Sequence, residues 1–154
     1  MENKSEFKVL LVEDNHDHAI IAKMALKKIN KISKIKHVDN GKKALNYLFD
    51  SQTSARKLPN LTILDLNMPE IDGFQVLKEI RNDKKMNGLP VVILTTSKNE
   101  SDVRKALELG VIEYFIKPID LKRLSEILDS IDCIGNLENK NMDNLNWRTM
   151  SFIL

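Results

Sequence analysis

The stretch Leu61-Thr-Ile-Leu-Asp-Leu66 is an apolar run of strand length with a single carboxylate, Asp65, near its end. Short apolar runs without alternation are typical of strands that are covered on both faces, as in a parallel sheet. A carboxylate inside such a strand is uncommon, because a buried charge needs a partner. Asp65 is therefore the first candidate for a functional residue.

Four more apolar runs of strand length occur in the chain, at residues 7–12, 35–38, 91–95 and 112–116. Stretches with apolar residues at helical spacing separate these runs. The stretch after the first run, for example, places at this spacing Ile21, Met24, Ala25, Lys28, Ile29 and Ile32. Strands that alternate with helices predict an α/β fold, with a doubly wound five-stranded parallel sheet in a three-layer α/β/α sandwich of the flavodoxin type.

The five strand–helix units are complete by about residue 132. Residues 136–154 follow as an asparagine-rich stretch with few helix formers, and large apolar residues gather there from Trp147 onward. We therefore predict one domain over residues 1–135 and a C-terminal extension, with no separate output domain. The polar stretch 50–60 is expected either to extend the second helix or to form an exposed loop.

The composition of the chain argues against several functional classes. The 24 basic and 22 acidic residues give a formal charge of +2, which is too even to predict binding to nucleic acid or to a membrane surface. One cysteine, Cys133, allows no internal disulfide and fits a reducing compartment. No apolar run is long enough to span a bilayer, and the first residues lack the apolar core of a signal peptide. A cytoplasmic protein is expected.

Candidate functional residues gather at the carboxyl ends of the predicted strands, where open parallel sheets bind ligands. The first strand leads into Glu13 and Asp14, the third contains Asp65, the fourth ends at Thr95 and the fifth precedes Lys117. Three converging carboxylates repel one another and need a cation, and oxygen ligands favour Mg²⁺ (or Mn²⁺). The ion would let one carboxylate attack phosphorus in line, while the lysine and the hydroxyl bind phosphoryl oxygens.

The motifs around these residues resemble the receiver domains of two-component response regulators. The matching segments, in the order and spacing of that family, are Val9-Leu-Leu-Val-Glu-Asp-Asn15, Leu64-Asp-Leu-Asn-Met-Pro69 with Asp72-Gly73, Pro90-Val-Val-Ile-Leu-Thr95 and Tyr114-Phe-Ile-Lys-Pro118. The resemblance covers about residues 6–132 and implies a chemotaxis-receiver-like sandwich. It also implies a signalling protein, not a dedicated enzyme, that accepts a phosphoryl group from a sensor histidine kinase.

The same resemblance implies a role for each residue of the acidic motifs. Asp65 corresponds to the phosphoacceptor, Asp14 to a direct Mg²⁺ ligand and Glu13 to a ligand that acts through water. Asn67 corresponds to the position whose backbone carbonyl completes the metal shell. Asn67 and Ser97 also occupy the two positions that tune self-dephosphorylation in this family.

Roles are likewise implied for the residues at the fourth and fifth strands. Thr95 and Lys117 correspond to the groups that bind phosphoryl oxygens after phosphorylation. Tyr114 corresponds to the aromatic side chain that changes rotamer together with Thr95, and Pro118 to a proline preceded by a cis peptide bond. Phosphorylation would then alter the face formed by the fourth helix, the fifth strand and the fifth helix, for partner binding or dimerisation.

Three other functions compete with that of a receiver. A phosphatase of the haloacid-dehalogenase type needs a second aspartate two residues after the first, where this chain has Asn67. A nucleotide or flavin binder needs a glycine-rich loop after the first strand, and that position is acidic. A pseudo-receiver that has lost phosphorylation stays open, although Asp14, Asp65, Thr95 and Lys117 are all present.

Partners can be predicted only by class. Residues 50–60, Asn67 and residues 94–100 resemble stand-alone receivers that work with phytochrome-type sensor kinases. The chain is too short to add a DNA-binding module after the fifth helix, so no direct contact with nucleic acid is expected. Residues 147–154 could pack on the domain or form a homodimer contact. The histidines, His16, His18 and His37, are not expected to be metal ligands, and His16 and His18 are expected at the surface near the mouth of the site.

Overall fold

The computed structural model of the chain describes residues 6–50 and 58–138, with side chains up to residue 131. In these ranges five parallel strands form one sheet in the order β2-β1-β3-β4-β5, and five helices accompany them. The elements, in chain order, are β1 (Lys8–Val12), α1 (His16–Leu26), β2 (Lys34–Val38), α2 (Gly41–Phe49), β3 (Leu61–Leu64), α3 (Gly73–Asn82), β4 (Val91–Thr95), α4 (Glu100–Glu108), β5 (Glu113–Ile116) and α5 (Leu121–Glu138).

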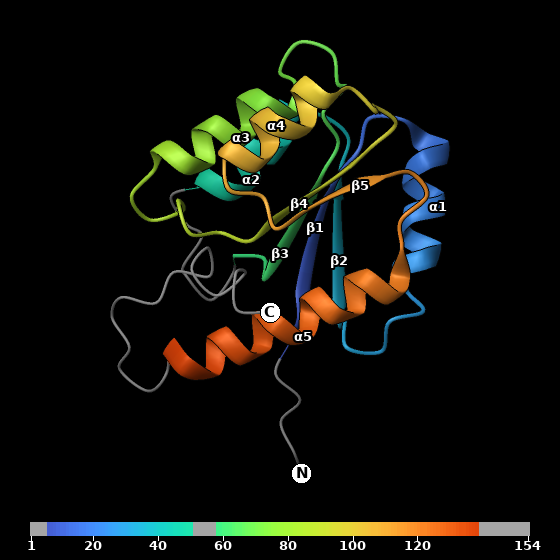
Figure 1. Cartoon of the computed structure of the whole chain (residues 1–154), viewed down its shortest axis with the longest axis vertical. Helices are drawn as coiled ribbons and strands as arrows, with labels where there is room; N and C mark the ends of the chain where they lie inside the picture. The colour runs from blue at the N-terminus through green and yellow to red at the C-terminus, as the bar shows by residue number, and fades with distance from the viewer. Residues whose placement is uncertain (1–5, 51–57, 139–154) are drawn as a thin grey trace.

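The helices cover both faces of the sheet. Helices α2, α3 and α4 lie together on one side, and α1 and α5 lie on the other (Figure 1). The chain winds from β1 outward to β2 and then returns past β1 to β3, so the winding reverses between β1 and β3. In an open α/β sheet this reversal leaves a crevice beyond the carboxyl ends of the strands. The predicted doubly wound three-layer sandwich is confirmed.

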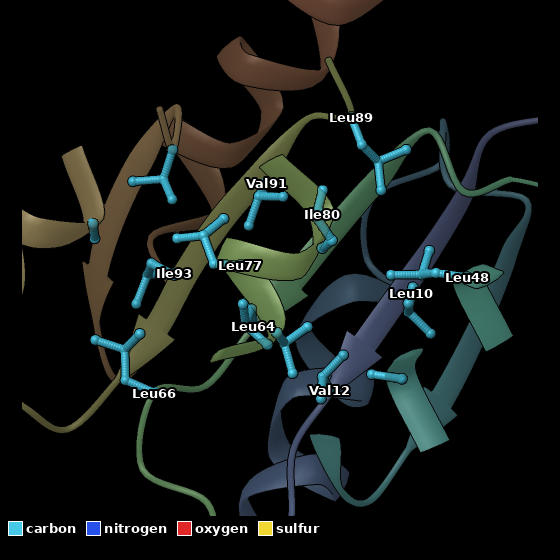
Figure 2. Packing of buried hydrophobic residues seen from close by; sticks show 14 of the residues in the cluster. Leu10, Val12, Leu48, Leu64, Leu66, Leu77, Ile80, Leu89, Val91 and Ile93 are labelled. Carbon is cyan, nitrogen blue, oxygen red and sulfur yellow. The ribbon is translucent and has the colours of Figure 1, made fainter. Parts of the chain in front are cut away.

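Two apolar clusters hold the layers together, because successive side chains of a strand point to opposite faces. On the α2–α3–α4 side, Leu10 and Leu64 pack with residues such as Leu48, Leu77 and Ile80 (Figure 2). On the α1–α5 side, the neighbouring strand positions pack with Leu26, Leu124 and Leu128, among others. Each fully buried aliphatic side chain contributes about 1.5–3 kcal/mol.

Side-chain caps start four of the helices just beyond the carboxyl ends of the strands. Asn15, Asn40, Asp72 and Asn99 each accept a hydrogen bond from a backbone N–H in the first turn of α1, α2, α3 and α4. At α3 the cap is reciprocal, since the Gln75 side chain also accepts from the Asp72 N–H. A cap of this kind contributes about 1 kcal/mol to helix stability. The caps therefore fix the loops that surround the crevice.

The buried side of α1 differs from the apolar side that the sequence predicts. The buried residues of this helix are Ala19, Ala22 and Leu26, whereas the side chains of Ile21 and Met24 are 58% and 63% exposed. Helix α1 is apolar on more than one side, so hydrophobic spacing alone does not fix which side faces the sheet. Small alanines face the sheet and let the helix pack close to it.

Several element ends also differ from the prediction. Strand β3 ends at Leu64, so Asp65 is the first residue beyond the strand and not a residue within it. Of the two alternatives for residues 50–60, extension of the second helix is not found, because α2 ends at Phe49 and the ψ of Asp50, 123°, is not helical. Helix α5 continues to Glu138, whereas the fifth strand–helix unit was expected to end by about residue 132.

The remainder of the polar stretch, residues 51–57, and the apolar end of the extension, residues 147–154, lie outside the described residues. Within the described part of the chain, no helix combines the length and the apolar character needed to cross a membrane.

Candidate functional site

Backbone hydrogen bonds beyond the strand ends position three of the predicted site residues. The N–H of Glu13 donates to Val38 O at 3.1 Å, and the N–H of Asp65 donates to Val12 O at 3.1 Å. The N–H of Lys117 donates to Thr95 O at 2.8 Å. The parallel ladder thus continues one step past β1, β3 and β5, which brings residues from distant parts of the chain to one edge of the sheet.

Three carboxylates meet at this edge. Ligand oxygens of Glu13, Asp14 and Asp65 all lie within 4.8 Å of one another. Glu13 and Asp65 are buried, at 3% and 5% exposure, whereas Asp14 is exposed to solvent. We refer to these three residues as the acidic cluster.

Lys117 supplies the positive charge that faces the acidic cluster. Its ammonium nitrogen lies 3.0 and 3.1 Å from the two Glu13 carboxylate oxygens and 3.2 Å from Asp65 Oδ2. One cation against three carboxylates leaves the edge with an excess of negative charge. The peptide bond between Lys117 and Pro118 is cis.

The pKa of Glu13 is raised in this setting. Burial, and next the hydrogen bond to Asp65, raise the pKa of Glu13 from 4.5 to about 7, although Lys117 acts in the opposite direction. A carboxyl group with this pKa is only partly ionised near pH 7, and added positive charge favours its ionised form. Clustered oxygen ligands that are partly buried and short of positive charge fit a hard divalent cation such as Mg²⁺ or Mn²⁺.

Thr95 joins the acidic cluster through Asn67. The Thr95 hydroxyl is fully buried and accepts from Asn67 Nδ2 at 3.5 Å and from the Ser97 N–H at 3.4 Å. The Asn67 N–H in turn donates to Asp65 Oδ1 at 3.2 Å. Both oxygens of Asp65 therefore face a donor, Oδ1 the backbone of Asn67 and Oδ2 the ammonium of Lys117.

Tyr114 contacts the loop between β4 and α4 and does not touch the acidic cluster. Its hydroxyl donates to the backbone carbonyl of Ser97 at 3.0 Å, and burial raises its pKa. The Ser97 hydroxyl donates to Asp102 at 2.7 Å. Tyr114, Ser97 and α4 are thus linked in a chain of hydrogen bonds that begins at the Thr95 hydroxyl.

Close backbone packing against Gly73 fixes the position of Asp65. A Cβ on Gly73 would lie 2.3 Å from the Asp65 carbonyl oxygen and 2.8 Å from Leu66 Cα, so only glycine fits at the start of α3. In the loop between them, Glu70 has a left-handed backbone with φ of 67°. The loop from β3 to α3 is therefore short, strained at one residue and pressed against the candidate acceptor.

Two histidines contact the site in ways that the sequence did not predict. His18 Nδ1 lies 2.9 Å from Lys117 Nζ and 3.4 Å from Glu13 Oε1. His37 Nε2 lies 2.9 Å from the Glu13 carbonyl oxygen, which can only accept, so this nitrogen donates. His18 was expected near the mouth of the site, and its spacing of one helical turn from Asp14 is the signal in the sequence that could have predicted a contact with the acidic edge.

An open parallel sheet of this strand order, with an acidic cluster and a lysine at the carboxyl edge, defines a receiver-type domain. The chain belongs to the family of response regulator receiver domains, and the family model matches residues 9–129. The acidic cluster, Thr95 and Lys117 all lie within the matched range.

Two relatives with similar sequences are named as regulatory proteins. Over 131 residues the chain is 36% identical to the probable methanogenesis regulatory protein FilR2 of Methanothrix harundinacea, covering 85% of this chain and 84% of that protein. Over 127 residues it is 36% identical to the response regulator Rcp1 of Synechocystis sp., covering 80% of this chain and 85% of Rcp1.

Solved structures of response regulators share the fold. The phosphorylated cyanobacterial phytochrome response regulator RcpA matches with a TM-score of 0.66 and 33% identity, covering 83% of this chain and 92% of that one. The Mn²⁺-bound form of Rcp1 matches with a TM-score of 0.64 and 32% identity, covering 90% of this chain and 96% of that one. The acidic cluster of the present chain is consistent with divalent metal binding.

Proposed function

We propose that this protein is the phospho-accepting receiver of a two-component system, and that Asp65 takes a phosphoryl group from a sensor histidine kinase with the help of Mg²⁺. The observation that carries the proposal is the setting of Asp65. It is a buried carboxylate whose oxygens face Lys117 and the Asn67 N–H and lie next to Glu13 and Asp14. A carboxylate with only a structural task would not need two further carboxylates beside it.

Four residues would hold the ion. Asp14 and Asp65 would bind it directly, the backbone carbonyl of Asn67 would complete its shell, and Glu13 would act through water. The ion would neutralise the acidic cluster and the oxygens of the incoming phosphoryl group. The exposure of Asp14 supports this assignment, because a direct ligand must reach an ion that enters from solvent.

The chain's own residues would carry out the transfer. A carboxylate oxygen of Asp65 forms the new O–P bond while the P–N bond to the donor histidine breaks, and its electron pair stays on nitrogen. Lys117, already 3.2 Å from Asp65 Oδ2, binds one phosphoryl oxygen, and the Thr95 hydroxyl binds another. Asn67, which is exposed, and Ser97 flank the path of the water that later removes the group.

The signal would leave through the face formed by α4, β5 and α5. When the Thr95 hydroxyl turns toward a phosphoryl oxygen, its contact with the Ser97 N–H is lost, and Ser97 is also the residue that Tyr114 holds. That face carries two exposed apolar side chains, Leu107 and Ile116, which suit a partner protein or a second copy of this chain.

Phosphorylation itself is tested with acetyl phosphate and Mg²⁺, followed by intact mass. We expect the wild type to gain a labile phosphoryl group and Asp65→Asn to gain none. Asp17→Asn is the matched control, because Asp17 is an exposed aspartate of α1 and its variant should behave as the wild type. Omitting Mg²⁺ should prevent the gain. A wild type that stays unmodified would favour the pseudo-receiver.

The output face is tested by comparing the amide NMR spectra of the free and beryllofluoride-bound protein. Shifts should extend from Asp65 to α4, β5 and α5. If they stay within the loops of the acidic cluster, the proposed face is wrong. Sedimentation of the two forms, with and without residues 139–154, separates dimerisation through this face from dimerisation through the extension.

A further inference from the structure

His18 contacts Lys117 more closely than either carboxylate does. Its backbone is fixed by the cap of α1, because the His18 N–H donates to Asn15 Oδ1 at 3.0 Å. From the first turn of α1 the ring reaches across the edge of the sheet, and Nδ1 lies 2.9 Å from Lys117 Nζ. The contact joins residues that are 99 positions apart in sequence, so it depends on the fold and not on local geometry.

The chemistry of the two groups fixes the direction of this hydrogen bond. A lysine ammonium has three hydrogens and no lone pair, so Lys117 donates and His18 Nδ1 accepts, with the hydrogen of the ring on Nε2. The alternative places a hydrogen on Nδ1 and directs it at Glu13 Oε1. That contact is longer, at 3.4 Å, and would set an N–H against the ammonium at 2.9 Å.

Lys117 therefore has more acceptors than hydrogens. Two oxygens of Glu13, one oxygen of Asp65 and His18 Nδ1 compete for three N–H bonds. Among these partners the Nδ1 atom of His18 is the acceptor that is not a carboxylate oxygen. It can keep hold of Lys117 without adding charge to an edge that already has too much negative charge, and it leaves the remaining hydrogens for Asp65 and an incoming phosphoryl oxygen.

The open space beside Lys117 lies on the side of His18, where Glu13 and Asp65 do not hold the ammonium. His18 and Lys117 both line a groove of about 320 Å³ between α1 and the start of α5, whose other walls are mostly apolar, including Ile21 and Ile119. A long lysine side chain without a lateral partner has room to move into this groove. Each such conformer takes the ammonium away from Asp65.

We propose that His18 is a positioning residue for phosphoryl transfer, whose Nδ1 holds the Lys117 ammonium between Glu13 and Asp65. The inference rests on the proposed function of Asp65. It assigns His18 a part in the rate at which the phosphoryl group is accepted, and no part in bonding to phosphorus or to the metal ion.

The test compares two variants of His18 with a control on the same helix. His18→Leu keeps much of the volume and removes the acceptor, whereas the side-chain oxygen of His18→Asn can stand where Nδ1 stands. His16→Leu is the control, because His16 is exposed and lies in the same turn of α1. The rate of phosphorylation by acetyl phosphate is measured in Mg²⁺, and the ¹⁵N resonance of the Lys117 ammonium is measured in the unphosphorylated protein.

We expect His18→Leu to lower the phosphorylation rate about tenfold, the size of one hydrogen bond to a charged group. His18→Asn should restore the rate to within about threefold of the wild type, and His16→Leu should leave it unchanged. The Lys117 resonance should move in His18→Leu and far less in His18→Asn. Because His18 is half-exposed, all variants should fold, which thermal unfolding checks.

Three outcomes would overturn the inference. These are a wild-type phosphorylation rate in His18→Leu, equal losses of rate in His18→Leu and His18→Asn, or a Lys117 resonance that is the same in His18→Leu as in the wild type. The failure of the proposed function is distinguishable, since it would appear as a wild type that accepts no phosphoryl group. In that case a resonance shift confined to His18→Leu would still establish the contact between His18 and Lys117. The proposed role of His18 in phosphoryl transfer would be wrong.

Discussion

The middle of the sheet and its carboxyl edge are held together by different interactions. In the middle, side chains such as Leu61, Ile63 and Leu64 are fully buried among other apolar groups. One residue further along the same strands, Glu13 and Asp65 are buried carboxylates that share a single lysine. The apolar middle carries no charge, whereas the edge sets three carboxylates against one lysine. The residues that stabilise the fold and the candidate site residues thus lie in adjacent layers. Substitutions at neighbouring positions should therefore affect either the free energy of unfolding or phosphorylation.

The largest effect is expected at Leu64, in the middle layer. Leu64→Ala leaves a cavity between β3 and the α2–α3 side and should lower the free energy of unfolding by about 3 kcal/mol. Asp65→Asn, at the next residue, removes a charge that repels Glu13 and should not lower stability in the absence of metal. Urea unfolding of both variants measures the contrast. Equal losses would show that the two layers are not separate.

The next largest effect is expected where the two layers touch, at Gly73. A Cβ there overlaps the Asp65 carbonyl, so Gly73→Ala should cost about 2 kcal/mol of stability and displace Asp65. Phosphorylation by acetyl phosphate should slow in the molecules that remain folded. Gly88→Ala is the matched control, since a Cβ at Gly88 meets nothing within 4 Å, and its stability should change little. Similar losses in both variants would contradict the close contact.

The pH dependence of the edge follows from the raised pKa of Glu13. Burial and Asp65 raise this pKa to about 7, so the folded protein without metal keeps a proton that the unfolded chain loses near pH 4.5. Stability linked to this proton is present at low pH and is lost as the pH rises through about 7. A divalent cation must displace the proton, so its apparent affinity should rise up to about tenfold per pH unit below 7 and level off above.

Calorimetric titration with Mg²⁺ at pH 6, 7 and 8 measures this slope. Glu13→Gln is the control, because glutamine has no proton to lose and its weaker affinity should not depend on pH over this range. A slope that persists in Glu13→Gln would assign the proton to another group.

The smallest effect is expected at Thr62, a polar group in the middle layer. Its Oγ1 is the buried side-chain oxygen that lacks a hydrogen-bond partner among the described residues. Thr62→Val keeps the shape and removes the unpaired hydroxyl, so the free energy of unfolding should rise by about 1 kcal/mol. Thermal unfolding measures the change, and phosphorylation should stay at the wild-type rate. A loss of stability would indicate that the hydroxyl is satisfied in solution.

The middle layer could be predicted from the sequence more fully than the edge. Apolar runs of strand length and the spacing of Leu124 and Leu128 determine which segments are strands and which are helices. The buried side of α1 could not be predicted, because Ile21 and Met24 outweigh Ala19 and Ala22 in hydrophobicity although the alanines face the sheet. Packing distance, which no single helix encodes, decides that choice.

At the edge, sequence motifs pointed to residues but not to their contacts. The spacing of the strands predicts that Glu13, Asp14 and Asp65 converge, and their ligand atoms do lie close together. The link from Lys117 to His18 was not predicted, since it depends on how a helix near the start of the chain meets a loop near residue 117. Nor does the motif reveal that Tyr114 donates to the Ser97 carbonyl in this structure.

The ion pair between Lys117 and Glu13 spans 104 residues of sequence, and this separation has a consequence for how the protein matures. Contacts of such high sequence separation form late in folding, because a long loop must close first. A chain folded only through β4 would hold the three carboxylates without their lysine. The acidic edge is thus completed only when β5 joins the sheet. A molecule in which Lys117 contacts Glu13 has therefore assembled all five strands.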